Sequence, residues 1–151
     1  MRILSLPFLH PFRDLGLLSV RLGVGVVMAL HGWTKWQAGP EGWLSGGMLA
    51  GLGIPAPVMM AWLVLIVELV GGILLVLGVL TRIFSLGTFI VLLVALTQVK
   101  GLAFLTTDPE TQALGVWGGS IDWVLLFSAL GLALLGPGRI ALDALLGIER
   151  D

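Results

Sequence analysis

The sequence contains no cysteine and no tyrosine, and only two of its residues are histidines. Without cysteine the chain forms no disulfide, no thiolate metal site and no iron–sulfur cluster of its own. The absence of tyrosine excludes tyrosyl radicals and phenolic acids. His10 and His31 are expected at opposite membrane surfaces, so they do not suit bis-histidine haem ligation. Electron transfer would therefore need a bound quinone or a partner protein.

Charge is also scarce. Only 11% of the residues are charged and 58% are hydrophobic, with a mean hydropathy of +1.07, whereas soluble domains carry about 25% charged residues. A soluble domain of this size must cover its outside with polar residues, and a lipid bilayer removes that requirement. The net charge of -1 argues against nucleic acid as a partner, because no basic stripe is present to neutralise phosphates.

Four long apolar segments predict four membrane-spanning helices, each near the ~20 residues that a span requires. They cover residues 15–36, 58–80, 83–105 and 119–136. The apolar runs are continuous rather than alternating, which favours helices over strands of a barrel. The short connection at Thr81-Arg82 makes the second and third helices antiparallel neighbours. We therefore expect one domain over residues 1–151, an all-α membrane protein built as a four-transmembrane-helix bundle with short surface helices at the termini.

The basic residues predict the orientation of the bundle. Lys35 and Lys100 fall near one surface, and the other surface receives most of the arginines, namely Arg2, Arg13, Arg82, Arg139 and Arg150. The positive-inside rule then places both termini in the cytoplasm of a bacterial or archaeal cell, with the bundle in its cytoplasmic (inner) membrane. Met1 to Phe12 is expected to stay on the chain and lie at the membrane surface. Residues 139–148 predict a short interfacial helix in which Arg139 and Asp143, spaced i, i+4, form a pair.

Two charged residues fall well inside predicted spans, away from the helix ends, where they are costly unless they have a partner or a function. Arg21 lies in the first span and Glu68 near the middle of the second. With a rise of about 1.5 Å per residue their heights differ by roughly 6 Å, which an extended arginine can reach. We expect a buried Arg21–Glu68 ion pair. The pair either fixes the two helices together or belongs to a proton or ligand site.

A second group of polar residues is expected near the outer ends of the helices. His31 and Lys35 are four residues apart and share a helix face, and Gln98 and Asp122 approach the same level from other spans. A few polar groups in an apolar pocket are the usual form of a small-molecule site. The carbonyls of a quinone need hydrogen-bond donors, and Asp122 would hold the imidazole. The alternative is that His31 and Asp122 only satisfy each other.

Tryptophans are concentrated at this outer level, where indole prefers the membrane interface. They form an aromatic belt, or one or two of them stack on a ligand. The candidate ligand-binding residues are therefore His31, Lys35, Gln98, Asp122, Trp33, Trp62 and Trp123. No metal site is expected, and no catalytic residue is assigned.

Five motifs in order resemble the DoxX family from about Leu15 to Asp143. They are Arg21-Leu22-Gly23 with His31-Gly32-Trp33-Thr34-Lys35, Gly51-Leu52-Gly53-Ile54-Pro55-Ala56-Pro57, Glu68-Leu69-Val70-Gly71-Gly72 with Gly78, Thr81-Arg82, and Gly136-Pro137-Gly138-Arg139 with Leu142-Asp143. The family often has a glutamate opening the last helix, where this sequence has Asp122, so the partner of this carboxylate can differ.

The resemblance implies a four-helix inner-membrane protein from the setting of a terminal oxidase and a thiosulfate:quinone oxidoreductase. We expect a small subunit or partner of a membrane redox system that binds a quinone-like, lipid-soluble ligand. The chain holds no cofactor of its own beyond such a quinone, and its partners are the lipid bilayer, a redox-complex protein or a second copy of itself. The alternatives are a non-catalytic accessory or scaffold subunit and a small-solute or lipid transporter. Whether the chain is an enzyme by itself stays open.

Overall fold

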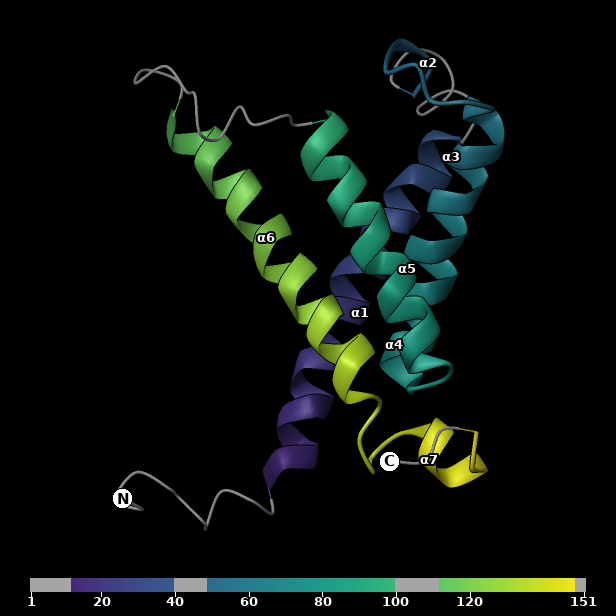
Figure 1. The fold of residues 1–151 in the computed structure, drawn as a ribbon, viewed down its shortest axis with the longest axis vertical. Helices are drawn as coiled ribbons and strands as arrows, with labels where there is room; N and C mark the ends of the chain where they lie inside the picture. The colour runs from purple at the N-terminus through teal and green to yellow at the C-terminus, as the bar shows by residue number, and fades with distance from the viewer. Residues whose placement is uncertain (1–11, 40–48, 100–111, 149–151) are drawn as a thin grey trace.

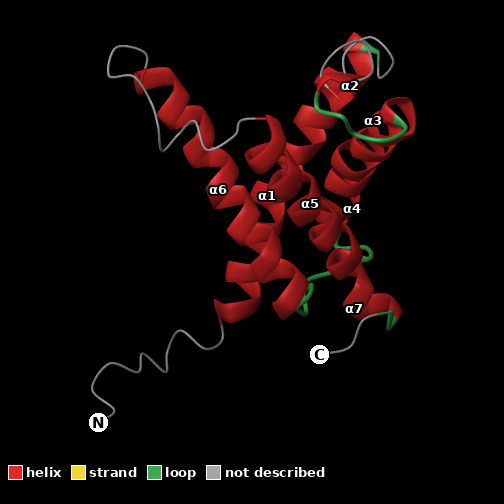
Figure 2. Cartoon of the chain, turned by 45° about the horizontal axis from the view of Figure 1, so that its top comes forward, coloured by secondary structure: helices red, strands yellow, loops and turns green. Residues whose placement is uncertain are grey.

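A computed structural model describes residues 12–39, 49–99 and 112–148, and its regular elements within these ranges are all helices (Figure 2). The first span is α1, Arg13–Ala38. The second is a continuous unit of α3 (Pro57–Leu65), the π-helix η3 (Ile66–Val70) and α4 (Gly71–Leu77). The third joins α5 (Thr81–Val94) to a second π-helix, η4 (Ala95–Val99), and the fourth is α6, Gln112–Leu135. Two short helices, α2 (Leu49–Gly51) and α7 (Leu142–Leu146), complete the order.

The predicted fold class, an all-α membrane protein built as a four-helix bundle, is confirmed. The helices at 13–38, 57–77 and 81–98 are long and apolar enough to cross a membrane, and 121–135 is a shorter apolar helix. Helix α6 begins earlier than the sequence predicts, at Gln112 instead of residue 119, and α5 begins at Thr81, so the tight connection is Gly78 to Leu80. The predicted surface segment at 1–12 and the end of the third span at Leu105 lie largely or wholly outside the described residues.

The helices run alternately up and down (Figure 1). We call the end with the start of α1, the Gly78–Leu80 turn and α7 the α7 end, and the opposite end the α2 end. α1 packs mainly on η3 and α4, and α6 packs mainly on α5. Toward the α2 end α6 leans away from α3, as both views show.

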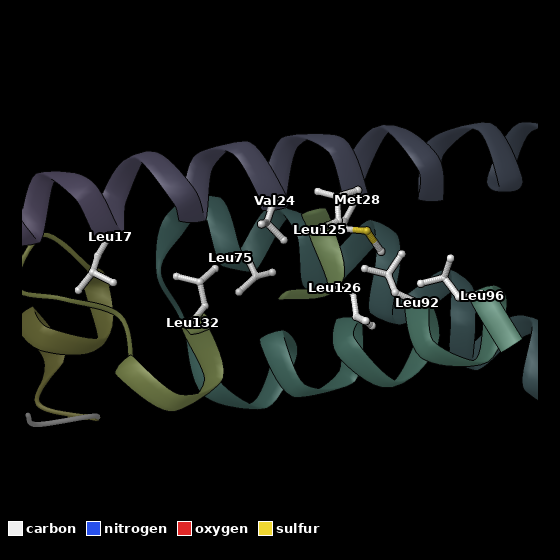
Figure 3. Close-up of a cluster of buried hydrophobic side chains, with 9 residues drawn as sticks. All are labelled: Leu17, Val24, Met28, Leu75, Leu92, Leu96, Leu125, Leu126 and Leu132. Carbon is white, nitrogen blue, oxygen red and sulfur yellow. The ribbon is translucent and has the colours of Figure 1, made fainter. Parts of the chain in front are cut away.

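A row of leucines, with one valine and one methionine, fills the bundle along its length (Figure 3). Val24 and Met28 of α1 face Leu75 of α4 near the middle of the row. Large apolar side chains also cover the outside, where Ile83 and Val124 are 62% and 66% exposed. This arrangement suits a protein whose surroundings are lipid, since water would penalise such a surface.

Glycines set the register between α1 and the second span. A Cβ atom added at Gly32 would lie 2.4 Å from the backbone nitrogen of Leu69, and one at Gly25 would lie 2.8 Å from the carbonyl oxygen of Gly72. Small residues allow this approach, which is how helices associate in a membrane where lipid is as apolar as leucine. Gly32 therefore lies level with η3.

The segment after α6 folds back over the α7 end. The Asp143 carboxylate, which is fully buried, accepts hydrogen bonds from the backbone N–H groups of Leu80 and Thr81 at 2.8 and 2.9 Å. These groups begin α5, so Asp143 caps that helix and opposes its positive end. The predicted Arg139–Asp143 pair is therefore wrong. The Arg139 side chain is exposed, its backbone N–H donates to Asp14 at 3.2 Å, and the predicted helix at 139–148 is limited to 142–146.

Candidate functional site

The structure does not pair Arg21 with Glu68. The glycine contacts place Glu68 level with the end of α1, whereas a Cβ atom added at Gly78 would lie 2.8 Å from Nη1 of Arg21. Ten residues separate Glu68 from Gly78, about 15 Å along a helix. The predicted pair is wrong because the heights of Arg21 and Glu68 along the bundle were counted from assumed helix ends. The register between α1 and the second span depends on the glycine contacts instead.

Arg21 instead belongs to the α7 end. Its guanidinium donates to the carbonyl oxygens of Pro137 and Ile140 at 2.7 and 2.6 Å, and it is within electrostatic range of Asp143. Arg21 is only 2% exposed, so these carbonyls replace the water that a buried charge would lose. The two positive-φ glycines around Pro137, Gly136 and Gly138, let the chain turn so that its carbonyls face α1. This network joins α1 to the segment that follows α6.

Glu68 pairs with Lys35 of α1 through Oε1. Lys35 lies about one turn beyond Gly32, and a helical side chain points back toward the start of its own helix. Its ammonium therefore reaches from the end of α1 down to η3 instead of out to the surface. The carboxylate and the ammonium are mostly buried, with side-chain exposures of 5% and 14%.

The backbone around Glu68 and its second oxygen are both unusual. Glu68 is the central residue of η3, and π-helical turns inside longer helices are frequent at functional sites. Its other oxygen, Oε2, is buried and has no hydrogen-bond partner within the described residues. An ionised or neutral carboxyl oxygen left this way costs free energy unless a donor reaches it. Oε2 is thus an open acceptor inside the bundle.

Further polar groups lie close to the level of this acceptor along the bundle. His31 and Asp122 act on Glu68 electrostatically, and Asp122 of α6 is buried, whereas the His31 side chain is exposed. Thr88 of α5 follows Gly87, whose added Cβ would lie 3.3 Å from Val67 of η3, so Thr88 is close to the level of Glu68. Thr88 is fully buried and its Oγ1 also has no partner within the described residues. The helical units α1, η3, α5 and α6 therefore each place a polar group at about the same height along the bundle.

The remaining predicted residues are less central. Trp33 and Gln98 are exposed, and Trp62, also exposed, meets Trp36 edge to face with ring centroids 6.4 Å apart. Trp123 is partly buried against the leucine core and stacks on Phe127 at 5.9 Å. The structure therefore brings Lys35, His31 and Asp122 together around Glu68.

Sequence reasoning placed Glu68 in the wrong pair and did not consider Thr88. The signal for Glu68 was the pair of glycines in α1, Gly25 opposite Gly72 and Gly32 opposite Leu69, which fixes the helix register. The signal for Thr88 was the neighbouring Gly87, which lies opposite Val67. Within the described ranges no group of three or more His, Cys, Asp or Glu side chains is arranged to hold a metal ion.

Comparison with known proteins identifies the family of this chain. A family model described as DoxX matches residues 16–101, more than half of the chain. The chain belongs to the DoxX family. The match includes α1, with Arg21 and Lys35, and the whole second span with Glu68. No solved structure matches the chain.

Two relatives extend the similarity over most of the chain. The protein named "Putative oxidoreductase CatD" of Bacillus subtilis is 32% identical over 130 residues, which cover 86% of each chain. The uncharacterized membrane protein Rv3486 of Mycobacterium tuberculosis is 32% identical over 139 residues, covering 89% of this chain and 83% of its own. This chain is thus a membrane protein of the DoxX family, similar to a relative that carries an oxidoreductase name.

Proposed function

We propose that this protein is a small component of a membrane redox system and that it binds a quinone-like, lipid-soluble ligand at Glu68. The observation that carries the proposal is the open Oε2 acceptor of Glu68 beside an ammonium group and a buried carboxylate. A quinol offers a hydroxyl donor to such an acceptor. Its oxidised form offers a carbonyl that the Lys35 ammonium or the Thr88 hydroxyl can bind.

The chemistry of the chain favours a partner for the electron transfer itself. The sequence has no cysteine or tyrosine, so the electrons would pass from the bound quinol to a group on another protein. The oxidoreductase name of the Bacillus subtilis relative points in the same direction. We infer that the protein works beside a redox subunit in the cytoplasmic (inner) membrane of a prokaryotic cell, with its α7 end in the cytoplasm.

A specific observation disfavours the transporter alternative. The two charged clusters, at Arg21 and at Glu68, are separated along the bundle by the buried apolar side chains Val24, Met28 and Leu75. A continuous polar path would have to pass through this layer. The accessory-subunit alternative differs from our proposal only in lacking the ligand, so ligand binding is the decisive measurement.

The test is thermal unfolding of the protein in mild detergent with a short-tailed benzoquinone in its oxidised and reduced forms. A ligand that binds only the folded state raises the melting temperature, by an amount that grows with the ratio of the ligand concentration to its Kd. We expect the quinol to raise it, and the shift to be lost in Glu68→Gln and reduced in Thr88→Val. Asp14→Asn, which changes a carboxylate at the α7 end, is the matched control and keeps the wild-type shift.

The proposal fails if neither form of the quinone shifts the wild-type melting temperature, or if Glu68→Gln responds like the wild type. Co-purification supplies the second arm. A redox protein should be recovered together with the tagged chain. The Glu68→Gln variant should recover the same amount of it as the wild type, because the partner binds a surface and the ligand binds the interior. Recovery of the chain with no redox protein would contradict the proposed association.

A further inference from the structure

A groove runs between α1 and α6 on the half of the bundle nearer the α7 end. Its volume is about 340 Å³, within the range of small-molecule clefts, about 300–1,000 Å³. Leu17 and Val20 line it on α1, and Phe127, Gly131 and Leu135, spaced four residues apart on one face, line it on α6. The groove is far from Glu68 along α1 and is apolar apart from Ser128.

Gly131 makes the groove deep. A Cβ atom added there meets nothing within 4 Å, and the neighbouring Leu132, which is 1% exposed, belongs to the core beneath. Walls of this kind do not retain water, because water needs two to four polar partners. An alkyl chain lying along Gly131 would instead regain the dispersion contacts that the separated helices lack.

Arginine residues are concentrated where the groove reaches the α7 end. Arg13 precedes Leu17 by four residues, so it continues the same face of α1 beyond the groove. On the other side, a Cβ atom added at Gly136 would lie 2.9 Å from the Arg82 guanidinium, and the exposed Arg139 follows Gly138, which contacts Leu17.

Acidic groups at this end do not cancel that charge. Among the described residues here, the Asp14 carboxylate accepts the Arg139 backbone N–H, and Asp143 is buried against the start of α5 and Arg21. Among the described residues at this end, four arginines (Arg13, Arg21, Arg82 and Arg139) outnumber two carboxylates (Asp14 and Asp143), so the described part carries a net positive charge.

We propose that this groove binds one acyl chain of an anionic phospholipid, whose phosphate lies against Arg13 and Arg139. The apolar walls fit the chain, and the arginines fit the headgroup charge. A neutral isoprenoid tail would leave the arginines without a role. A second copy of the protein, related by an axis along the membrane normal, would bring the same arginines toward each other.

Native mass spectrometry of the protein in mild detergent tests this inference. Dioleoyl phosphatidylglycerol and dioleoyl phosphatidylcholine, which share their acyl chains, are added in equal amounts. We expect one phosphatidylglycerol per chain to be retained in preference to phosphatidylcholine. Gly131→Leu should lower that retention about tenfold, and Gly131→Ala should lower it less. Gly23→Leu is the matched control, because an added Cβ there also meets nothing within 4 Å and lies outside the groove.

The headgroup is tested separately. Arg13→Gln combined with Arg139→Gln should abolish the preference for phosphatidylglycerol, and Arg13→Lys with Arg139→Lys should keep it. The inference is overturned by equal retention of the two lipids in the wild type, by unchanged retention in Gly131→Leu, or by an equal loss in Gly23→Leu. It is also overturned if a neutral quinone displaces the lipid, or if Gly131→Leu breaks a dimer. None of these results depends on Glu68.

Discussion

Lys35 of α1 and Glu68 of η3 form an ion pair across the helix contact that Gly32 makes possible. Both side chains are mostly buried, so each charge depends on the other. Arg21, which is also buried, is held at the α7 end by backbone carbonyls. The charged residues inside the bundle therefore form two separate networks, one at each end of the apolar middle.

The first prediction concerns the Lys35–Glu68 pair. Lys35→Met leaves the Glu68 carboxylate buried without its partner, and such a loss costs about 3–5 kcal/mol. The double variant Lys35→Met/Glu68→Met should recover most of that loss, since it removes both charges. Unfolding of the four proteins in mild detergent measures the coupling, and additive losses would show that the two residues do not pair.

Arg21 supplies the control for that cycle. Arg21 and Glu68 lie roughly 15 Å apart along the bundle, and residues at such separations contribute independently. Arg21→Met and Glu68→Gln should therefore destabilise additively, within about 0.5 kcal/mol. A large coupling between them would contradict the helix register described above.

A second prediction concerns the cap that Asp143 places on α5. Asp143→Ala removes the acceptor of two backbone N–H groups and the charge opposite Arg21. We expect a loss of about 2–4 kcal/mol, above the ~1 kcal/mol of an ordinary cap, because the groups left unpaired are buried. Hydrogen exchange should show faster exchange at Leu80 and Thr81. Protection that stays at the wild-type level would argue against the cap.

Glycine packing gives the third prediction. Gly32→Ala places a methyl group 2.4 Å from the Leu69 backbone, and a rigid backbone cannot move aside without separating the helices. The unfolding temperature should fall. Gly23→Ala meets nothing within 4 Å and replaces the poorer helix former, so its stability should equal or exceed the wild type. Equal effects of the two changes would exclude close packing as the cause.

The orientation can be tested with single cysteines, because the sequence has none of its own. Leu145, which is 78% exposed on α7, and Gln37, near the end of α1, mark the two ends. In whole cells a membrane-impermeant maleimide should label Gln37→Cys and leave Leu145→Cys unlabelled until the membrane is opened. The reverse pattern would place the α7 end outside.

Much of the fold follows from hydropathy alone. Long apolar runs interrupted by glycine and proline predict four helices, because lipid leaves the backbone few other ways to satisfy its hydrogen bonds. What hydropathy does not contain is the register between helices. That register depends on close contacts at Gly25 and Gly32, and it decides which charges meet.

The site was therefore predicted in part. Lys35, His31 and Asp122 were predicted as ligand-binding residues because they lie at the same height near the outer ends of the helices. In the structure Lys35 pairs with Glu68, and His31 and Asp122 act on Glu68 electrostatically. The sequence pattern assigned Glu68 to Arg21 because both lie within spans. The i, i+4 rule likewise assigned Asp143 to Arg139, whereas a buried helix start at Thr81 offers a carboxylate more hydrogen bonds than an exposed arginine does.

The carbonyl acceptors of Arg21 have a consequence for how the chain is made. They lie 116 and 119 residues further along the sequence. During synthesis the first three spans enter the membrane while these carbonyls are still in the ribosome. At that stage the Arg21 guanidinium does not have these acceptors for its hydrogen bonds. The segment after α6 is then the one that completes this network. Until it arrives, Arg21 lacks the carbonyl acceptors that offset the cost of burying its charge.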